Sequence, residues 1–290
     1  MMTQPSVQDL GRLADPLLIF GGIYGNLEAF DALVAKAAEL GVTPEHMIHT
    51  GDVAAYCADT FACADKLQAL GCPAIKGNVE EQLAESADDC ACGFDEGSEC
   101  DLLAMRWYAM ANTQSTPDLR RWMAALPDHL SFSMQGRRFV VVHGSPRLIN
   151  EFMFCSLDDA RFTEQLDLVN ADCIIAGHTG LPFTKRIGPR LWHNSGALGL
   201  PANDATQRVW VSMLTPQASG IEFSFHALEY DYRATAAKMR DAGLPQGYAQ
   251  GLETGLWPNT DILPAAESAE TGVELNPRSY TWPSLRAAAE

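Results

Sequence analysis

Residues 17–41 read LLIFGGIYGNLEAFDALVAKAAELG. The run LLIF is short and apolar and is followed by two glycines, which is typical of a buried strand that ends in a tight turn. From Asn26 onward the apolar residues recur at helical spacing, and Gly41 stands where helices commonly end. The stretch therefore predicts a strand–turn–helix unit, which is the repeating element of α/β folds.

The same alternation continues toward the C-terminus. HMIHT (46–50) predicts a second strand, a helix is expected over about 60–70, and PAIK (73–76) predicts a third strand. The later expected elements are a hairpin turning at Gln135-Gly136, a helix over about 157–169, a buried strand CIIAG, β-type runs between 183 and 228, and a final helix over about 231–242. This order of elements predicts an α/β layer structure.

One domain is expected over residues 1–257, with two additions. Residues 80–127 are acidic, carry cysteines and predict helices over about 101–112 and 116–125, so they are expected to form an insertion over the ligand site. Residues 258–290 are rich in Pro, Ala, Glu and Ser and are expected to form a surface tail.

The charge of the chain limits its partners. A net charge of −17 argues against a nucleic acid or an anionic membrane, because binding to either requires clustered Lys and Arg. It leaves room for a small phosphorylated molecule, since a metal ion supplies local positive charge. No apolar run reaches about 18 residues, and the polar N-terminal segment does not resemble a signal peptide, so a cytoplasmic protein is expected.

Polar side chains follow the predicted strands, each beside a glycine. They are Asp52, Asn78, His143 and His178, with the glycine-rich turn 21–25 after the first strand. Ligands collect at the carboxyl ends of strands in open α/β sheets, so these side chains are expected to meet. One carboxylate, one amide and two imidazoles make a mixed donor set of the kind that holds Mn, Fe or Zn.

The order of these motifs resembles that of the calcineurin-like metallophosphoesterases, most closely their YfcE and diadenosine-tetraphosphatase-like branch. The family pattern is Asp-x-His, Gly-Asp, Gly-Asn-His, His and Gly-His-x-His. The resemblance covers about residues 16–250 and includes His-Gly-Ser-Pro-Arg at 143–147 and Asn-Ser-Gly-Ala at 194–197. It implies a two-sheet metallophosphoesterase sandwich flanked by helices, with the helical insertion over the site.

Four positions depart from that pattern. Gly22 and Tyr24 stand where the first motif has Asp and His, and Val79 and Gly180 each replace a histidine. Of the four family ligands for one metal ion, only the bridging aspartate remains. The ligands of the other ion are all present, as Asp52, Asn78, His143 and His178. The resemblance therefore implies a site for no more than one ordinary divalent ion.

The resemblance also implies further roles. Asp52, His143 and His178 are expected to be catalytic, because they would hold the metal ion that acts on the substrate. The candidate substrate-binding residues are Tyr24, Asn26 and Arg147, the last because it lies beside the fourth motif. Tyr24 is open to three roles: a phosphate ligand, an acid, or a filler of the space of the missing ion. The third-motif histidine, which assists protonation of the leaving group in the family, is absent.

The role of the cysteines stays open. Cys90, Cys92 and Cys100 follow Asn78 closely enough to fold back over the site, and Cys57 lies just after Asp52. Their thiolates would offer a softer ligand set in place of the lost one, while the alternative is a cap loop with ordinary thiols. Structural disulfides are not expected in a cytoplasmic protein.

Two functions from different classes follow. The first is a phosphoester hydrolase that acts on a small phosphorylated metabolite or nucleotide with one ion or an atypical ion. The second is a catalytically silent homologue that binds a phosphorylated ligand or a protein partner. The loss of ligands favours the second, and the complete half-site favours the first. The oligomeric state stays open, a homo-oligomer included.

Overall fold

Residues 5–285 are described by a computed structural model, in which two β-sheets pack face to face between layers of helices. The strands of the first sheet, in spatial order, are β1 (Val7–Arg12), β4 (His129–Met134), β5 (Arg137–Val141), β6 (Cys173–Ala176), β8 (Arg190–Ser195) and β7 (Pro182–Ile187). Those of the second sheet are β11 (Tyr280–Pro283), β10 (Gly220–Leu228), β9 (Val209–Gln217), β2 (Leu17–Phe20) and β3 (Met47–His49). The expected two-sheet α/β sandwich is therefore confirmed.

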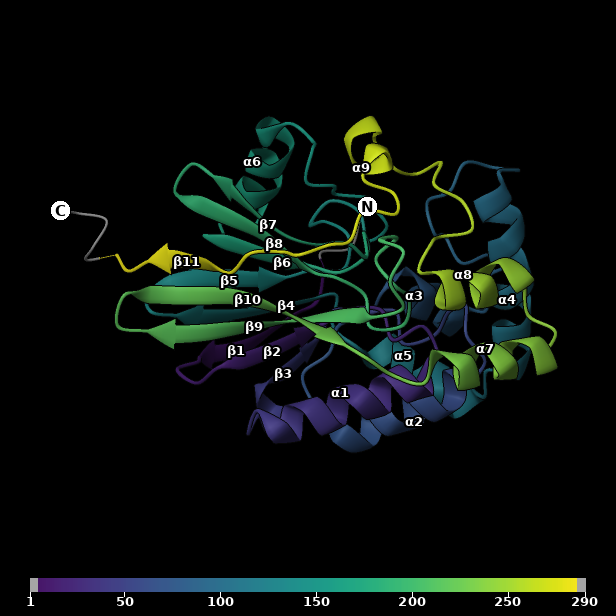
Figure 1. The fold of residues 1–290 in the computed structure, drawn as a ribbon. Coiled ribbons are helices and arrows are strands. Elements are labelled where there is room, and N and C mark those ends of the chain that lie inside the picture. Colours follow the sequence, from purple (N-terminus) through teal and green to yellow (C-terminus); the bar gives the residue numbers. More distant parts are fainter. Residues whose placement is uncertain (1–4, 286–290) are drawn as a thin grey trace.

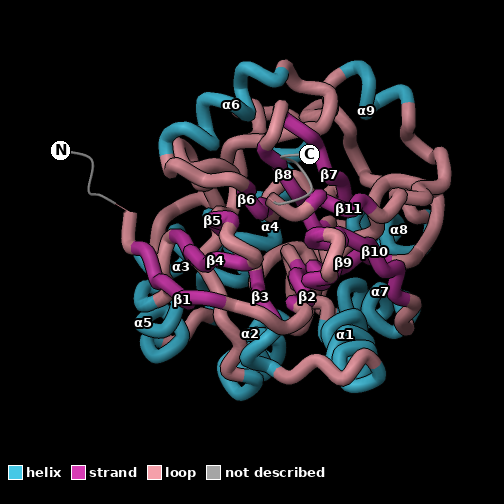
Figure 2. The backbone as a smooth tube through the Cα atoms, turned by 90° about the vertical axis from the view of Figure 1, so that its left-hand side faces the viewer, coloured by secondary structure: helices cyan, strands magenta, loops and turns pink. Residues whose placement is uncertain are grey.

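Helices cover both outer faces of the sandwich. Their bounds are α1 (Leu27–Glu39), the short 3-10 helix η1 (Pro44–His46), α2 (Thr60–Leu70), α3 (Asn78–Glu85), α4 (Glu99–Gln114), α5 (Pro117–Ala125), α6 (Asp159–Leu168), α7 (Tyr232–Asp241), α8 (Gln246–Thr254) and α9 (Ala265–Ala269). Figure 2 shows α1 and α2 on one side of the sheets and α6 and α9 on the opposite side. In Figure 1, α3, α4, α7 and α8 gather at one end of the strands.

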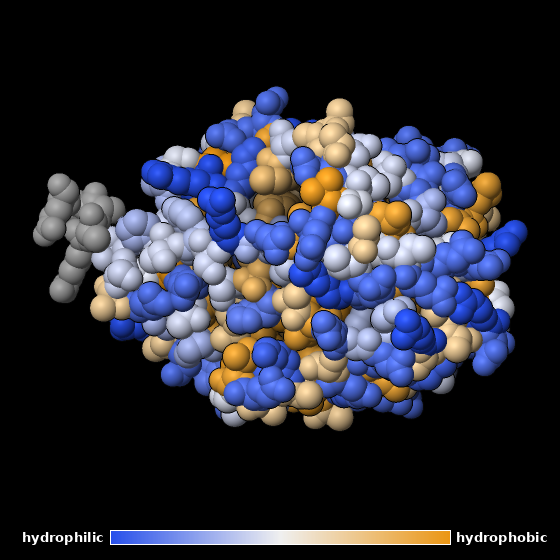
Figure 3. All heavy atoms as spheres, viewed as in Figure 1, coloured by the Kyte–Doolittle hydropathy of each residue, from blue (hydrophilic) through white to orange (hydrophobic). Residues whose placement is uncertain are grey.

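Three apolar layers hold these elements together. Side chains from both sheets, among them Ile19, Phe139 and Phe223, interdigitate between the sheets. A larger cluster lies under α1, α2, α7 and α8, and a smaller one lies under α6. The outer surface is mostly hydrophilic on the face drawn in Figure 3, with scattered apolar atoms, as expected for a chain of charge −17. Within residues 5–285 no helix has both the length and the apolarity needed to cross a bilayer.

Several local predictions were incomplete. The N-terminal segment forms the edge strand β1, parallel to β4, and its mostly exposed side chains give no apolar pattern by which to find it. PAIK contributes only an isolated bridge between Ala74 and His49. Helix α8 was not predicted.

The predicted surface tail is wrong for its C-terminal part. Strand β11 pairs antiparallel with β10, and the Trp282 side chain is buried between the sheets. The guanidinium of Arg137 lies 3.8 Å from the centre of the Trp282 ring. Residues 280–283 are thus part of the sandwich, because this four-residue strand pairs with the open edge of β10.

Candidate metal centre

The four predicted ligands come from the ends of strands in both sheets. Asp52 lies in the turn after β3, Asn78 is the first residue of α3, and His143 and His178 follow β5 and β6. The turns after β5 and β6 are joined, since the backbone N–H groups of Gly177 and His178 both donate to the carbonyl of His143. The parallel pairing of β5 with β6 therefore places both imidazoles at one edge of the sandwich.

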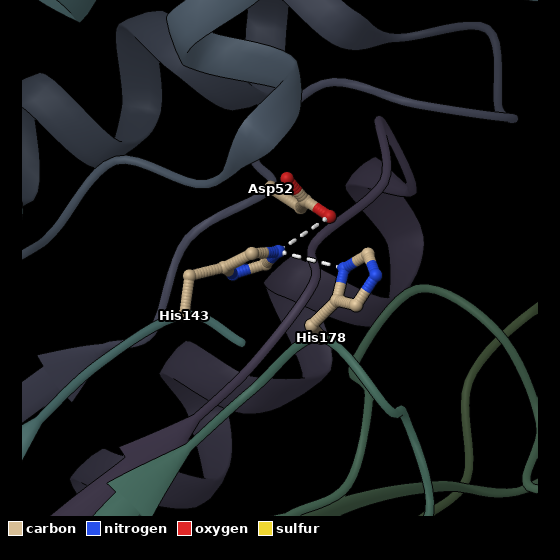
Figure 4. Close-up of side chains that lie close together, drawn as sticks. All are labelled: Asp52, His143 and His178. Carbon is tan, nitrogen blue, oxygen red and sulfur yellow. Dashed lines mark hydrogen bonds and ion pairs between the residues drawn. The ribbon is translucent and has the colours of Figure 1, made fainter. Parts of the chain in front are cut away.

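One oxygen of Asp52, one oxygen of Asn78 and one nitrogen of His178 surround a ring nitrogen of His143. His143 Nε2 lies 3.1 Å from Asp52 Oδ2, from Asn78 Oδ1 and from His178 Nδ1. Figure 4 shows the carboxylate and the two rings pointing toward one another. Single ligand atoms of Asp52, His143 and His178 all lie within 4.8 Å of one another. The predicted convergence of these residues is present in the structure.

The hydrogen bonds around the cluster define which atoms carry lone pairs. His143 Nδ1 lies 2.7 Å from the carbonyl oxygen of Thr50, which only accepts, so the proton of a neutral imidazole sits on Nδ1 and leaves Nε2 bare. The Asn78 amide nitrogen donates to the Cys90 carbonyl at 2.9 Å, which turns Oδ1 toward His143. The cluster thus presents a carboxylate, an amide oxygen and two imidazole nitrogens to one another.

Such a set fits a divalent cation. Buried lone pairs that face one another are unfavourable unless a positive charge lies between them, and these side chains are almost completely buried apart from His178. The Thr50 carbonyl holds the His143 tautomer in the way that outer partners orient metal-binding histidines. Asp52, Asn78, His143 and His178 would hold the ion, and their N/O composition suits Mn, Fe or Zn.

The pKa values of the ligand side chains in the protein without an ion also reflect how closely these groups are packed. Burial lowers the pKa of His143, but the Asp52 carboxylate outweighs it and raises the pKa above its usual value. Burial and the adjacent His143 lower the pKa of His178 to about 3. Burial raises the pKa of Asp52, while His143 lowers it by more, so the carboxylate stays ionised. The pKa shifts of His143 and Asp52 both show that the cluster favours a positive charge next to the Asp52 carboxylate.

Glu80 is a site residue that the sequence analysis missed. Its side chain is fully buried, and it accepts hydrogen bonds from the backbone N–H of Asp52 (2.7 Å), Val53 (2.9 Å) and Gly77 (2.8 Å). Burial and the Asp52 carboxylate raise the pKa of Glu80 to about 7, and the backbone donors oppose this shift. Glu80 therefore joins the turn that carries Asp52 to the start of α3. A glutamate at the third position of a helix, reaching back to the cap, is the signal that would have found it.

We expect Glu80→Gln to lower both the stability of the protein and the affinity of the centre for its ion. The new amide group would turn an N–H toward backbone N–H donors, which should lower the free energy of unfolding by about 2 kcal/mol. Misplacing Asp52 should lower ion affinity by about 10–100-fold. Denaturant unfolding and metal titration measure the two effects. Glu81→Gln, which alters the partly exposed neighbour, should change neither, and equal losses in both variants would contradict the positioning role of Glu80.

Tyr24 fills the space beside the lost ligand. A Cβ atom on Gly22 would overlap the phenol ring of Tyr24, so the ring lies where an aspartate side chain would begin. The backbone N–H of Tyr24 donates to the Asp52 carbonyl, and its ring packs edge-on against Tyr56 at 4.8 Å between centroids. Burial, followed by the Asp52 carboxylate, raises the pKa of Tyr24, so the phenol is neutral. Of the three roles considered for Tyr24, this placement supports the one in which its side chain fills the space of the missing ion.

Two of the predicted substrate-binding residues lie elsewhere. Asn26 is fully buried and caps α1, with Oδ1 accepting from the Ala29 N–H and Nδ2 donating to the Gly199 carbonyl. Arg147 points to the surface, where its half-exposed side chain pairs with Glu164. Neither side chain lines the cavity beside the centre, because adjacency to a motif in sequence does not determine the direction of a side chain.

The cysteine loop covers the amide ligand. Cys90 and Cys92 form a disulfide, which contradicts both the expected absence of disulfides and the thiolate-ligand alternative for this pair. Cys92 lines the cavity beside the centre, and Cys57 is buried with its sulfur 4.0 Å from the Gly199 carbonyl oxygen. The side chain of Cys100 lies outside the described part of the structure.

A cavity of about 70 Å³ opens at the centre. Asp52 and His178 form its polar end, and Phe152 packs on the His178 ring at 4.4 Å between centroids. The remaining walls are mainly aromatic and apolar, and they include Tyr24, Tyr56, Tyr248 and Trp257. Pro258, Asn259 and Ile262, from the expected surface tail, thus line the cavity together with Trp257.

Comparison with known proteins decides the family. The model of the calcineurin-like phosphoesterase superfamily domain matches residues 17–216. The chain belongs to this superfamily. The family match includes all four candidate ligands and ends before α8 and the segment that closes the cavity.

Solved structures of this phosphoesterase fold agree with that assignment. The chain is similar to a metallophosphoesterase from Sphaerobacter thermophilus, with a TM-score of 0.66 and 22% identity. It is also similar to a hypothetical protein from Pyrococcus horikoshii OT3, with a TM-score of 0.71 and 15% identity. Each comparison covers 84% of this chain and 100% of the other. At these identities the likeness extends to the fold alone, and no curated protein matches the chain.

Proposed function

We propose that this phosphoesterase-family chain is a phosphoester hydrolase that works with one divalent ion at Asp52, Asn78, His143 and His178. The observation that carries the proposal is the convergence of Asp52 Oδ2, Asn78 Oδ1 and His178 Nδ1 at 3.1 Å from His143 Nε2. Four electron-pair donors that face one another, with no lysine or arginine among them, form a cation site.

Several residues of the chain have separate roles in the proposed reaction. When bound, a divalent ion polarises a phosphoryl oxygen and lowers the pKa of bound water. Thr50 fixes the His143 tautomer, and Glu80 fixes the Asp52 turn. The aromatic walls exclude water from the polar end of the cavity. Val79, at the position of the family's third-motif histidine, supplies no proton, so turnover is expected to be slow.

A second candidate is a catalytically silent homologue that binds a phosphorylated ligand. It is favoured by the Tyr24 ring beside Gly22, which fills the place of a first-motif ligand, and by Val79. A one-ion centre without a positioned acid still attracts an anion. The two functions therefore share the metal centre and differ in turnover.

Elemental analysis and a hydrolysis assay separate these functions. Purified full-length protein should contain close to one transition-metal ion per chain and should hydrolyse an aryl phosphodiester in added manganese faster than its Asp52→Asn variant. Protein that holds the ion but hydrolyses no faster than the variant would favour the silent homologue. Protein that holds no ion, even after incubation with manganese, would overturn the proposal.

A further inference from the structure

The outer wall of the cavity is built by the chain beyond the family match. Trp257, Pro258 and Ile262 line the cavity together with Tyr248 of α8. The segment is held in place, because the Trp257 indole N–H donates to the Pro201 carbonyl at 2.7 Å and its backbone N–H donates to Asn203 Oδ1 at 2.9 Å. This wall lies outside the family match and is fixed well enough to select among ligands.

The charge of the cavity limits the charge of its ligand. Among the described lining residues Asp52 is the sole charged side chain, and neither lysine nor arginine lines the space. Among the groups that face the cavity, an ion of two positive charges together with the Asp52 carboxylate leaves one net positive charge. That charge balances a monoanion, whereas a second negative charge would be buried against apolar walls without a partner, which is costly.

The size of the cavity limits the ligand further. A volume of about 70 Å³ is well below the roughly 300–1,000 Å³ of pockets that enclose drug-sized ligands. A small cavity favours a compact phosphoryl ligand over a nucleotide. The apolar walls favour alkyl groups over hydroxylated ones.

From these observations, and resting on the proposed one-ion centre, we infer that the site selects a compact, singly charged phosphodiester with short apolar ester groups. The ion and His178 face the phosphoryl group, and Trp257 and Ile262 contact the ester group and limit its length. Monoesters, which are dianions at neutral pH, and nucleotides are selected against. Trp257 is a specificity-determining residue in this scheme.

Ligand binding tests the charge selection without requiring turnover. Manganese-loaded full-length protein is titrated by calorimetry at about pH 8, where phosphomonoesters are dianions. Diethyl phosphate should bind at least about tenfold more tightly than ethyl phosphate or adenosine monophosphate. Equal or tighter binding of either dianion would overturn the charge selection.

Variants of the wall test the size selection. Trp257→Ala should raise the affinity for diphenyl phosphate relative to diethyl phosphate by about tenfold, because removal of the indole opens the closed end. Ile262→Ala, which keeps the indole hydrogen bond, should shift the same ratio in the same direction. The control is Leu263→Ala, in the same segment but lining a separate cavity, and it should leave the ratio unchanged. A ratio that stays constant in both wall variants would overturn the role of the wall.

A neutral ligand separates this inference from the proposed function. If the protein binds no ion, the one-ion centre and the charge selection fail together. The size selection is still measured with triethyl phosphate and triphenyl phosphate in the metal-free protein, where the wall variants should favour the larger ester. An unchanged preference there would overturn the size selection independently of the metal.

Discussion

The quadruple variant Gly22→Asp, Tyr24→His, Val79→His and Gly180→His is expected to bind a second ion and to hydrolyse an aryl phosphodiester at least about 10²-fold faster than the wild type. The four changes restore the ligands and the proton donor that the family pattern contains. The reason for expecting success is that the remaining half of the centre is already assembled around His143. A second ion beside it would share Asp52.

The changes depend on one another. Gly22→Asp alone should lower the free energy of unfolding by about 1–3 kcal/mol, because its Cβ would overlap the Tyr24 ring. Tyr24→His shortens that ring and should recover most of the loss, which a double-mutant cycle measures. Gly180 has a φ of +73°, so a histidine there costs about 1–2 kcal/mol, although nearby atoms leave room for it.

Metal analysis and hydrolysis in manganese, each on folded protein, check the restoration. The matched control is the quadruple variant with Asp52→Asn added, which should lose the gained activity because both ions need that carboxylate. A folded quadruple variant that binds one ion and gains no activity would show that the site was rebuilt for another purpose.

His143→Ala should abolish stoichiometric metal binding, with affinity lowered by more than about 10²-fold. The effect is expected to exceed the 10–100-fold loss seen when an outer partner of a ligand is removed, because Nε2 faces every other donor of the centre. Titration with manganese and zinc, read by calorimetry, measures it. Any hydrolysis should fall in parallel.

A matched histidine provides the control for that variant. His226→Ala removes an imidazole on β10 that contacts Ser224, away from the centre, and should leave metal binding unchanged. If His143→Ala does not fold, Asp52→Asn keeps the shape of the side chain and removes its charge. Retention of wild-type affinity in Asp52→Asn would contradict the assignment of the centre.

The short motifs at strand ends were sufficient to predict the half-site. Asp52, Asn78 and His178 each follow a glycine and His143 precedes one, all at the end of a strand or the start of a helix, and the carboxyl ends of parallel strands lie at one edge. The hydrophobic periodicity of residues 17–41 likewise determines a strand and a helix, because burial of one face is a local requirement. The departures at Gly22, Tyr24, Val79 and Gly180 are equally visible in the sequence.

Contacts between distant segments were decided by the tertiary structure alone. The Tyr24 ring beside Gly22 and the Cys90 carbonyl on Asn78 depend on side-chain and loop directions that no spacing encodes. Arg147 and Asn26 lie away from the cavity for the same reason. The helix position of Glu80 indicates its cap, but the contact of its carboxylate with the Asp52 turn is a tertiary one. Strand β11 and the Trp257 wall lie at the other end of the chain from Tyr24, and packing brings them to the sandwich and the cavity. Local patterns thus determine elements and their ends, while long-range burial decides which side chains close the site.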